Sequence, residues 1–175
     1  MINNLGDLFK PALNAYPEVC VDWFDDFEGP NKYAFLSNFY EAEVTVFGKQ
    51  FPTTEHAFAW MKPNEDDPIR DQIQQAQGPG MAKSLGRQCN LRPDWELIKF
   101  DVMKEVVEAK FDQNPDLARS LTATGDAYLQ EGTFWGDEVW GVDWYSAPYW
   151  EDRRGRNWLG MILMSERARQ KAVWR

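Results

Sequence analysis

The sequence predicts a mainly helical α+β domain in which a few short strands accompany the helices. The segment Pro93–Phe111 carries apolar residues spaced by three or four, which is the period of an amphipathic helix. A short alternating stretch around Gly48 is typical of a β-hairpin. Signals for helix starts follow at Thr53 and at Asp67-Pro68. With 175 residues the chain is long enough for one domain around one core.

The first part of the chain predicts strands and one short helix. Val19–Phe27 is rich in β-branched and aromatic residues and predicts a strand, which the following Gly-Pro pair ends. Residues 43–51 predict a hairpin with its turn at Gly48. Thr53 is then expected to cap a helix that runs to about Met61.

Helices are expected to dominate the middle of the chain. A helix begins at Pro68, and the Gly-Pro-Gly sequence at 78–80 is expected to stop it. Residues 81–87 predict a short helix closed by Gly86. The long helix follows, with an apolar stripe of Trp95, Ile98, Val102, Val106 and Ala109.

The last third of the chain predicts two helices around an aromatic loop. Asn114-Pro115 starts the first helix, which ends at Thr124-Gly125. Gly132–Trp150 is rich in tryptophan and glycine and predicts a loop with a functional role. A final amphipathic helix is expected after Asn157, through Leu159, Ile162, Leu163 and Arg167.

The charge and the aromatic content limit the partners of the chain. Its formal net charge is −9 at pH 7, so its surface repels the phosphates of an extended nucleic-acid duplex. The aromatic content of 15% exceeds the need of a minimal core and indicates that some rings line a small-molecule pocket. The sequence gives no basis for an oligomeric state.

The cysteines and the histidine bear on compartment and metal content. Cys20 and Cys89 lack metal-binding or CxxC spacing, which is typical of reduced, intracellular thiols. With one histidine, a protein zinc site is not expected. The first residues lack a signal-peptide pattern, and no stretch approaches the ~20 apolar residues of a membrane span. We therefore expect a cytoplasmic protein with no membrane contact, no metal and no other cofactor.

Two carboxylates lie among aromatic residues, whereas a nucleophile-elbow serine and a phosphate-binding P-loop are absent from the sequence. Glu55 is in the TTEH sequence, and Asp137 is in WGDEVWG. A carboxylate beside aromatic walls suits N-glycoside cleavage, because the anion stabilises an oxocarbenium-like state while rings hold a planar base. Each acid also has a structural interpretation: Glu55 as a favourable charge at a helix N-terminus, and Asp137 as the acceptor of an Asx-type turn before Trp140.

Several ordered motifs resemble those of the NADAR or YbiA-like family. They are GPNKYAFLSNFY, FGKQFPTTEHA with Lys62, AKSLGR, RPDW, VMKEVVEAKF, LTATGD, WGDEVWG and GRNWLG. The resemblance covers about Phe24 to Arg167. It implies a compact helical fold with short strands, forming a single domain over residues 1–175.

The resemblance also implies an N-glycosidase activity. YbiA-like members are associated with hydrolysing the N-glycosidic bond of early phosphorylated intermediates of riboflavin synthesis, and other NADAR members with ADP-ribose attached to guanine. Both reactions break a ribosyl C–N bond. Carried onto this sequence, the family pattern points to Glu55, Lys62, Asp137, Trp140 and Asn157.

The chemistry of the side chains suggests a role for each position. Glu55 would activate water or stabilise the ribosyl cation, with Asp137 as its partner. Trp135 and Trp140 would wall the base. Lys62 has the alternative role of forming a Schiff base with an opened ribose. Asn38 would form hydrogen bonds to sugar or base edges. Lys62, Lys83 and Lys110 would bind phosphate or ribose. The full set of remaining substrate-binding candidates is Asn38, Phe39, Lys83, Lys110 and Asn157. Each lysine has the alternative of a surface role.

The chain departs from the family pattern at Ala59, where Gln is usual, at Thr133, where Asn is frequent, and in a long insert at residues 144–155. These departures leave the predicted fold unchanged and bear on which substrate the chain accepts. A phosphorylated ribosylated base is the preferred hypothesis. The alternatives are an ADP-ribosyl-guanine hydrolase that reverses nucleic-acid modification, and a nonenzymatic module that binds ADP-ribose or a related nucleotide.

Overall fold

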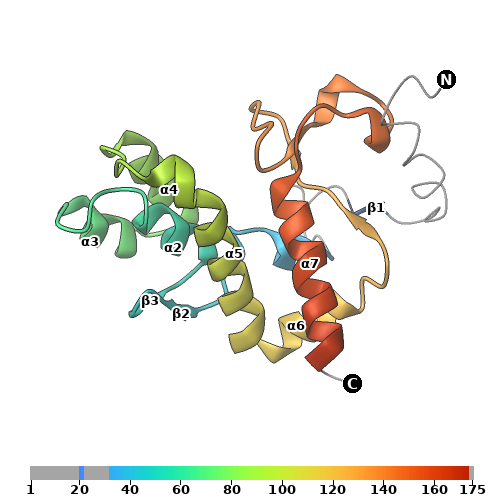
Figure 1. The fold of residues 1–175 in the computed structure, drawn as a ribbon, viewed down its shortest axis with the longest axis horizontal. Helices are drawn as coiled ribbons and strands as arrows, with labels where there is room; N and C mark the ends of the chain where they lie inside the picture. The colour runs from blue at the N-terminus through green and yellow to red at the C-terminus, as the bar shows by residue number, and fades with distance from the viewer. Residues whose placement is uncertain (1–19, 22–31, 174–175) are drawn as a thin grey trace. The chain divides into compact units, whose positions relative to one another are not determined.

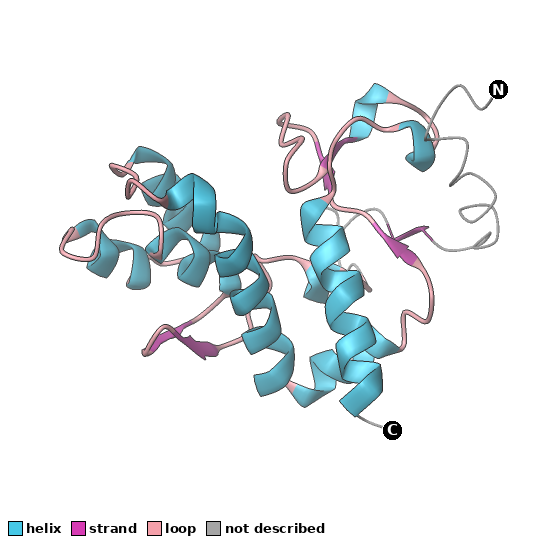
Figure 2. Cartoon of the chain, in the orientation of Figure 1, coloured by secondary structure: helices cyan, strands magenta, loops and turns pink. Residues whose placement is uncertain are grey.

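The computed structural model describes residues 20–21 and 32–173. Short strands precede and follow a run of helices in this part of the chain (Figure 2), which confirms the predicted mainly helical α+β class. The chain divides into a helix-rich unit, formed by Phe24–Thr122 and Ser165–Arg175, and a loop-rich unit, formed by Met1–Trp23 and Ala123–Met164. The single domain expected over residues 1–175 stays a prediction. No helix in the described ranges is long and apolar enough to cross a membrane.

The helix-rich unit begins with a short 3₁₀ turn, η1 (Ala34–Leu36), and the predicted hairpin. Strands β2 (Val44–Val46) and β3 (Lys49–Phe51) pair antiparallel, with Val44 opposite Phe51. The intervening Phe47 and Gly48 both have left-handed backbones, with φ of 54° and 70°. Two positive φ angles are what a tight two-residue hairpin turn requires, so the expected turn at Gly48 is confirmed.

Helix α2 (Thr54–Trp60) starts where the sequence predicts it. Thr53 is extended, and its hydroxyl accepts a hydrogen bond from the His56 backbone N–H at 3.4 Å. That bond satisfies one of the amide groups that a helix start leaves without a partner. All seven residues of α2 are buried, and the helix packs against α3, α4 and α5.

The structure corrects the predicted boundaries of the next two helices. Helix α3 (Ile69–Gln74) ends before the Gly-Pro-Gly sequence, and α4 (Pro79–Gln88) begins inside it. Pro79 occupies the first helical position, where a missing N–H costs nothing. Gly86 does not close α4 but lies buried within it. The position suits glycine, since a Cβ there would come within 3.0 Å of the Ala59 Cβ.

The long helix predicted at Pro93–Phe111 is confirmed as α5 (Trp95–Gln113), and α6 (Pro115–Thr122) follows. Helix α5 packs against β2 and α2 (Figure 1). Trp95, Val102 and Val106 of the expected stripe are buried, whereas the remaining two members are partly exposed. The stripe therefore contributes three residues to the core of this unit.

The loop-rich unit contains strand pairs of two residues each. Strand β1 (Cys20–Val21) pairs parallel with β4 (Tyr128–Leu129), and β5 (Gly132–Thr133) pairs parallel with β6 (Val142–Asp143). Residues 22–27 of the strand predicted at Val19–Phe27, together with Val19, lie outside the described residues. Two 3₁₀ turns, η2 (Trp144–Ser146) and η3 (Trp150–Asp152), form part of the sequence insert.

The final helix, α7 (Trp158–Val173), contributes its first turns to the loop-rich unit and its last turns to the helix-rich unit. In the loop-rich unit its residues Leu159 and Leu163 are buried, as are Leu129 and Val142 of the strands. Gly160 allows a close approach there, since a Cβ at this position would be 2.1 Å from the Leu129 carbonyl oxygen.

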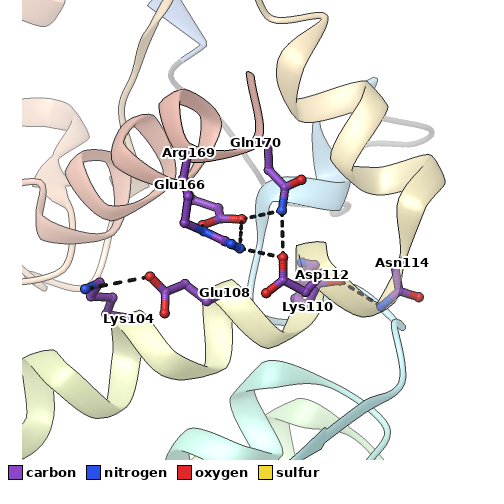
Figure 3. A network of polar contacts seen from close by, with 8 residues as sticks. All are labelled: Lys104, Glu108, Lys110, Asp112, Asn114, Glu166, Arg169 and Gln170. Carbon is purple, nitrogen blue, oxygen red and sulfur yellow. Dashed lines mark hydrogen bonds and ion pairs between the residues drawn. The ribbon is translucent and has the colours of Figure 1, made fainter. Parts of the chain in front are cut away.

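In the helix-rich unit the last turns of α7 are joined to α5 by a polar network (Figure 3). The Arg169 guanidinium lies 2.5 Å from Asp112 and 2.7 Å from Glu166. Gln170 donates to the same two carboxylates, at 2.9 and 2.8 Å. Glu166 is only 3% exposed, so these donors satisfy a buried carboxylate.

Candidate active site

The first candidate carboxylate, Glu55, sits in the first turn of α2 and is 6% exposed. Its backbone N–H donates to the carbonyl oxygen of Asn38 at 3.0 Å. The partial positive charge at a helix N-terminus favours a negative group at this position. Beside it, the Nδ1 atom of His56 lies 2.8 Å from the Thr53 hydroxyl, and its Nε2 lies 3.2 Å from the Ala76 carbonyl oxygen. Both ring nitrogens of this histidine are therefore engaged within the fold.

Asn38 connects the turn before the hairpin to α2 and α5. Its Oδ1 accepts a hydrogen bond from the Thr54 hydroxyl at 3.0 Å, and its Nδ2 donates to the Met103 sulfur at 3.2 Å. The side chain is 8% exposed. Its amide thus contacts neighbouring protein groups beside Glu55, and its predicted hydrogen bonds to a substrate stay a prediction.

Lys62 follows Glu55 by two helical turns and lies over aromatic rings. Its Nζ is 5.1 Å from the ring centre of Phe58 and 6.0 Å from that of Trp95, within the range of a cation–π interaction. Burial lowers the pKa of Lys62, and the charge of Glu55 opposes this shift. The nearby cations Lys83 and Arg87 lower the same pKa further, so positive charge accumulates around this ammonium group.

Helix α4 brings the second lysine to the same neighbourhood. Gly86 packs closely on α2, since a Cβ there would lie 3.0 Å from the Ala59 Cβ, and it would lie 3.4 Å from the Lys62 Cδ beyond the end of α2. From α4, Lys83 places its Nζ 5.2 Å from the ring centre of Phe39. Ala59 is fully buried against Gly86. The small residues at this contact let α2 and α4 approach each other.

Lys110 points its ammonium group into the helix-rich unit. The residue is 1% exposed, and its Nζ donates to the Ser37 carbonyl oxygen at 2.7 Å. The ring centres of Tyr40 and Phe111 lie 5.5 and 5.7 Å from the same nitrogen. This lysine therefore holds a backbone carbonyl next to Asn38, and a contact with phosphate or ribose stays a prediction.

In the loop-rich unit, Asp137 accepts two backbone hydrogen bonds on one oxygen. Its Oδ1 receives the N–H groups of Val139 at 3.2 Å and Trp140 at 3.0 Å. Gly136 precedes it with a φ of 77°, a conformation that favours glycine. This geometry is the Asx-type turn given above as the structural interpretation of Asp137, and a catalytic role stays a prediction.

The aromatic residues near Asp137 differ in exposure. Trp135 is 49% exposed and Trp140 is partly buried. Phe134, 42% exposed, has its ring centre 6.5 Å from that of Trp135 and 5.3 Å from that of Tyr145 in the insert. Rings are therefore accessible in this unit, as a wall for a planar base requires.

Asn157 uses its whole side-chain amide within the loop-rich unit. Its Oδ1 accepts from the Glu131 N–H at 2.9 Å, and its Nδ2 donates to the Leu129 carbonyl at 2.8 Å and to the Tyr128 hydroxyl at 3.2 Å. The residue is 3% exposed and has a left-handed backbone with φ of 52°. It ties the start of α7 to the segment that contains β4 and β5.

Two groups of predicted residues result, one within each unit. Those of the helix-rich unit are Asn38, Phe39, Glu55, Lys62, Lys83 and Lys110; those of the loop-rich unit are Trp135, Asp137, Trp140 and Asn157. Sequence reasoning missed Arg87, Phe58 and Trp95. Phe58 and Arg87 stand four positions from Lys62 and Lys83, respectively, a helical spacing that could have indicated them. Among the described residues, no three His, Cys, Asp or Glu side chains gather to hold a metal ion.

The helix-rich unit thus has the features of a small-molecule site: a buried carboxylate at a helix start, cations beside it and aromatic rings beneath the cations. The chain belongs to the NADAR domain family, whose sequence model matches residues 26–171. The family predicted from the sequence motifs is therefore confirmed.

Two curated relatives and one solved structure are similar to this chain. The chain is 36% identical over 141 residues to the protein named N-glycosidase YbiA of Escherichia coli, covering 77% of this chain and 80% of the relative. It is 35% identical over 147 residues to a riboflavin biosynthesis protein of Vibrio vulnificus, covering 81% of this chain but 36% of that protein. The NMR structure of Escherichia coli YbiA matches with a TM-score of 0.74 and 31% identity, over 89% of this chain and 87% of the other.

Proposed function

We propose that this chain is an N-glycosidase that hydrolyses the ribosyl C–N bond of a phosphorylated ribosylated base. The observation that carries the proposal is the buried carboxylate of Glu55 at a helix start, with the cations of Lys62, Lys83 and Arg87 nearby. An anion can stabilise positive charge at the sugar carbon, and cations can bind the phosphate. The names of the relatives agree with this class of enzyme.

The proposed reaction is a hydrolysis at the anomeric carbon. The C1′–N bond breaks, and its electron pair leaves with the base nitrogen, which takes up a proton from solvent water. A water oxygen then bonds to C1′, and the proton that this water loses passes to the Glu55 carboxylate, which releases it to the solvent and is thereby regenerated. The products are the free base and ribose 5-phosphate.

An early intermediate of riboflavin synthesis is the preferred substrate, since one relative is named a riboflavin biosynthesis protein. The chain spans about a third of that relative, so the substrate is part of our proposal. Ribosylaminopyrimidine phosphate and ADP-ribosylated guanosine should be incubated separately with the protein, and the released product, a free pyrimidine base or guanosine, identified by mass spectrometry. Release from the first substrate supports the proposal, whereas release from the second alone identifies the alternative hydrolase. Calorimetric binding of nucleotide without turnover identifies the nonenzymatic module.

The role of Glu55 is tested by Glu55→Gln, which keeps the shape and removes the charge. We expect the rate to fall on the order of 10²- to 10⁴-fold, the usual contribution of general acid–base catalysis. Glu105→Gln is the matched control because Glu105 is exposed on α5, and its rate should equal that of the unaltered protein. Full activity of Glu55→Gln would refute the assignment.

Asp137→Asn separates the two interpretations of Asp137. The asparagine oxygen can accept the same two backbone hydrogen bonds, so the turn is kept while the charge is lost. We propose that Asp137 supplies a second negative charge during the reaction, and we therefore expect a lower rate with unchanged folding. An unchanged rate would show that Asp137 forms the turn and has no catalytic role.

Lys62 has two proposed roles that one pair of experiments separates. As a cation it would bind phosphate; as a neutral amine, which its lowered pKa favours, it would form a Schiff base with an opened ribose. Lys62→Arg keeps the charge but cannot form an imine, so retained activity supports phosphate binding. A borohydride-stabilised adduct at Lys62, found by peptide mass spectrometry, supports the covalent role.

The cytoplasmic location stays a prediction.

A further inference from the structure

Lys110 is a charged residue in the interior of the helix-rich unit. It is 1% exposed, and its Nζ donates to the Ser37 carbonyl oxygen at 2.7 Å. A buried ammonium group is costly unless hydrogen bonds compensate it. The hydrogen bond to Ser37 therefore offsets part of the cost of burying this ammonium group.

The carbonyl group that Lys110 contacts belongs to a tight turn. Ser37 follows η1, and its carbonyl oxygen also accepts from the Tyr40 N–H at 3.3 Å. Its hydroxyl accepts from the Phe39 N–H at 3.1 Å. The next residue, Asn38, offers its own carbonyl oxygen to the Glu55 N–H at 3.0 Å. The backbone of the candidate catalytic carboxylate thus rests on this turn.

Helix α5 supports the turn at two points, two helical turns apart. Lys110 contacts Ser37, and the Met103 sulfur accepts the Asn38 side-chain amide at 3.2 Å. The Thr54 hydroxyl adds bonds to Asn38, at 3.0 Å to Oδ1 and 3.3 Å to the carbonyl oxygen. The start of α2 is consequently fixed to α5 through residues 37 and 38.

We propose that Lys110 is a positioning residue, which sets the place of Glu55 through the Ser37–Asn38 turn without contacting substrate. The inference rests on the proposed function of Glu55. Catalytic groups must be held close to their productive geometry, and a shift of about 1 Å can cost on the order of 10²-fold in rate. A donor buried behind the turn provides such support.

The direct test is Lys110→Met, which keeps the length of the side chain and removes its donor. We expect kcat to fall on the order of 10- to 100-fold with KM close to that of the unaltered protein, the pattern of an interaction needed in the transition state. Lys104→Met is the matched control, since Lys104 is exposed on the same helix and pairs with the surface residue Glu108 at 3.7 Å. An unchanged kcat would overturn the proposal. A raised KM with kcat retained would also overturn it, because that pattern indicates a substrate-binding lysine.

A second measurement needs no substrate and separates failure of this inference from failure of the proposed function. Amide hydrogen exchange by NMR should accelerate at Glu55 in Lys110→Met while the interior amides of α5 keep their protection. Unaltered exchange at Glu55 would overturn the inference, even for a protein that turns over no N-glycoside. If Lys110→Met does not fold, Lys110→Gln, whose side chain is uncharged and one bond shorter, takes its place with the same expected results.

A double-mutant cycle completes the test. Thr54→Val keeps the shape of Thr54 and removes its hydrogen bonds to Asn38, further along the same path. The effects of Lys110→Met and Thr54→Val on kcat should be non-additive, because both loosen one turn. Independent effects would show that Lys110 acts elsewhere and would overturn the proposal.

Discussion

Two helix glycines, Gly160 and Gly80, should respond in opposite directions to substitution by alanine. Both lie in the first turn of a helix, Gly160 in α7 and Gly80 in α4. A Cβ at Gly80 would meet no atom within 4 Å. A Cβ at Gly160 would lie 2.1 Å from the Leu129 carbonyl oxygen and 2.6 Å from both polar atoms of the Asn157 amide.

The magnitude for Gly160→Ala follows from the contacts that must be given up. Real Cβ atoms do not approach other heavy atoms so closely, so α7 has to move away from Leu129 and the Asn157 amide has to rotate. The three hydrogen bonds of Asn157 are each worth about 1 kcal/mol. Alanine returns up to ~1 kcal/mol of helix propensity. The net loss in the free energy of unfolding is therefore about 2 kcal/mol or more.

Equilibrium unfolding in urea, followed by circular dichroism, measures both variants. Gly80→Ala should unfold at higher urea concentration, with a gain of roughly 0.5 kcal/mol, because alanine restricts the unfolded chain and favours the helix. A Gly160→Ala protein as stable as the unaltered chain would refute the close packing of α7 on Leu129. Destabilisation of both variants to the same extent would show that the two glycines share another requirement.

Further predictions concern ionisable groups. Burial lowers the pKa of His56 below 6.5, against a raising effect of the hydrogen bond to the backbone of Ala76. Between the lowered pKa and 6.5 the unfolded chain binds a proton that the folded chain does not, so the free energy of unfolding should fall as the pH drops below about 6.5; the chain has one histidine, whose single imidazole NMR signal reports the pKa. Arg169→Met should cost about 2 kcal/mol in urea unfolding, since the buried Glu166 loses its cation. The exposed Arg119, replaced in the same way, should change stability by less than about 0.5 kcal/mol.

The parts of the fold that local chemistry decides were predictable from the sequence. Thr53 before a buried run predicted the start of α2, and the alternating residues around Gly48 predicted the hairpin. The Gly-Pro-Gly sequence at 78–80 was interpreted wrongly, because a Gly-Pro pair can end one helix or begin the next. What places Gly86 inside α4 is its contact with Ala59, and no local pattern contains that contact.

The candidate site was predictable only as a set of residue types. The sequence indicated Glu55 from its place at a helix start, and the structure shows it buried there. It gave equal reason to expect Lys83 and Lys110 at phosphate, since helical spacing does not tell which carbonyl group or ring a lysine will meet. The same limit applies to Asn157. Its side-chain hydrogen bonds are to Leu129 and Glu131, nearly thirty positions away in the sequence. Side-chain partners at such separations are set by tertiary packing.

The joining of α7 to α5 has a consequence for synthesis of the chain. The helix-rich unit takes its last residues from Ser165–Arg175, so a ribosome must synthesise the chain through Gln170 before Asp112 can meet both Arg169 and Gln170. Until then the unit is incomplete at this contact. The group on α5 that lacks its partners until then is Asp112, an exposed carboxylate, which water solvates well. The nascent chain therefore presents a charge at this place instead of an apolar surface that would promote aggregation.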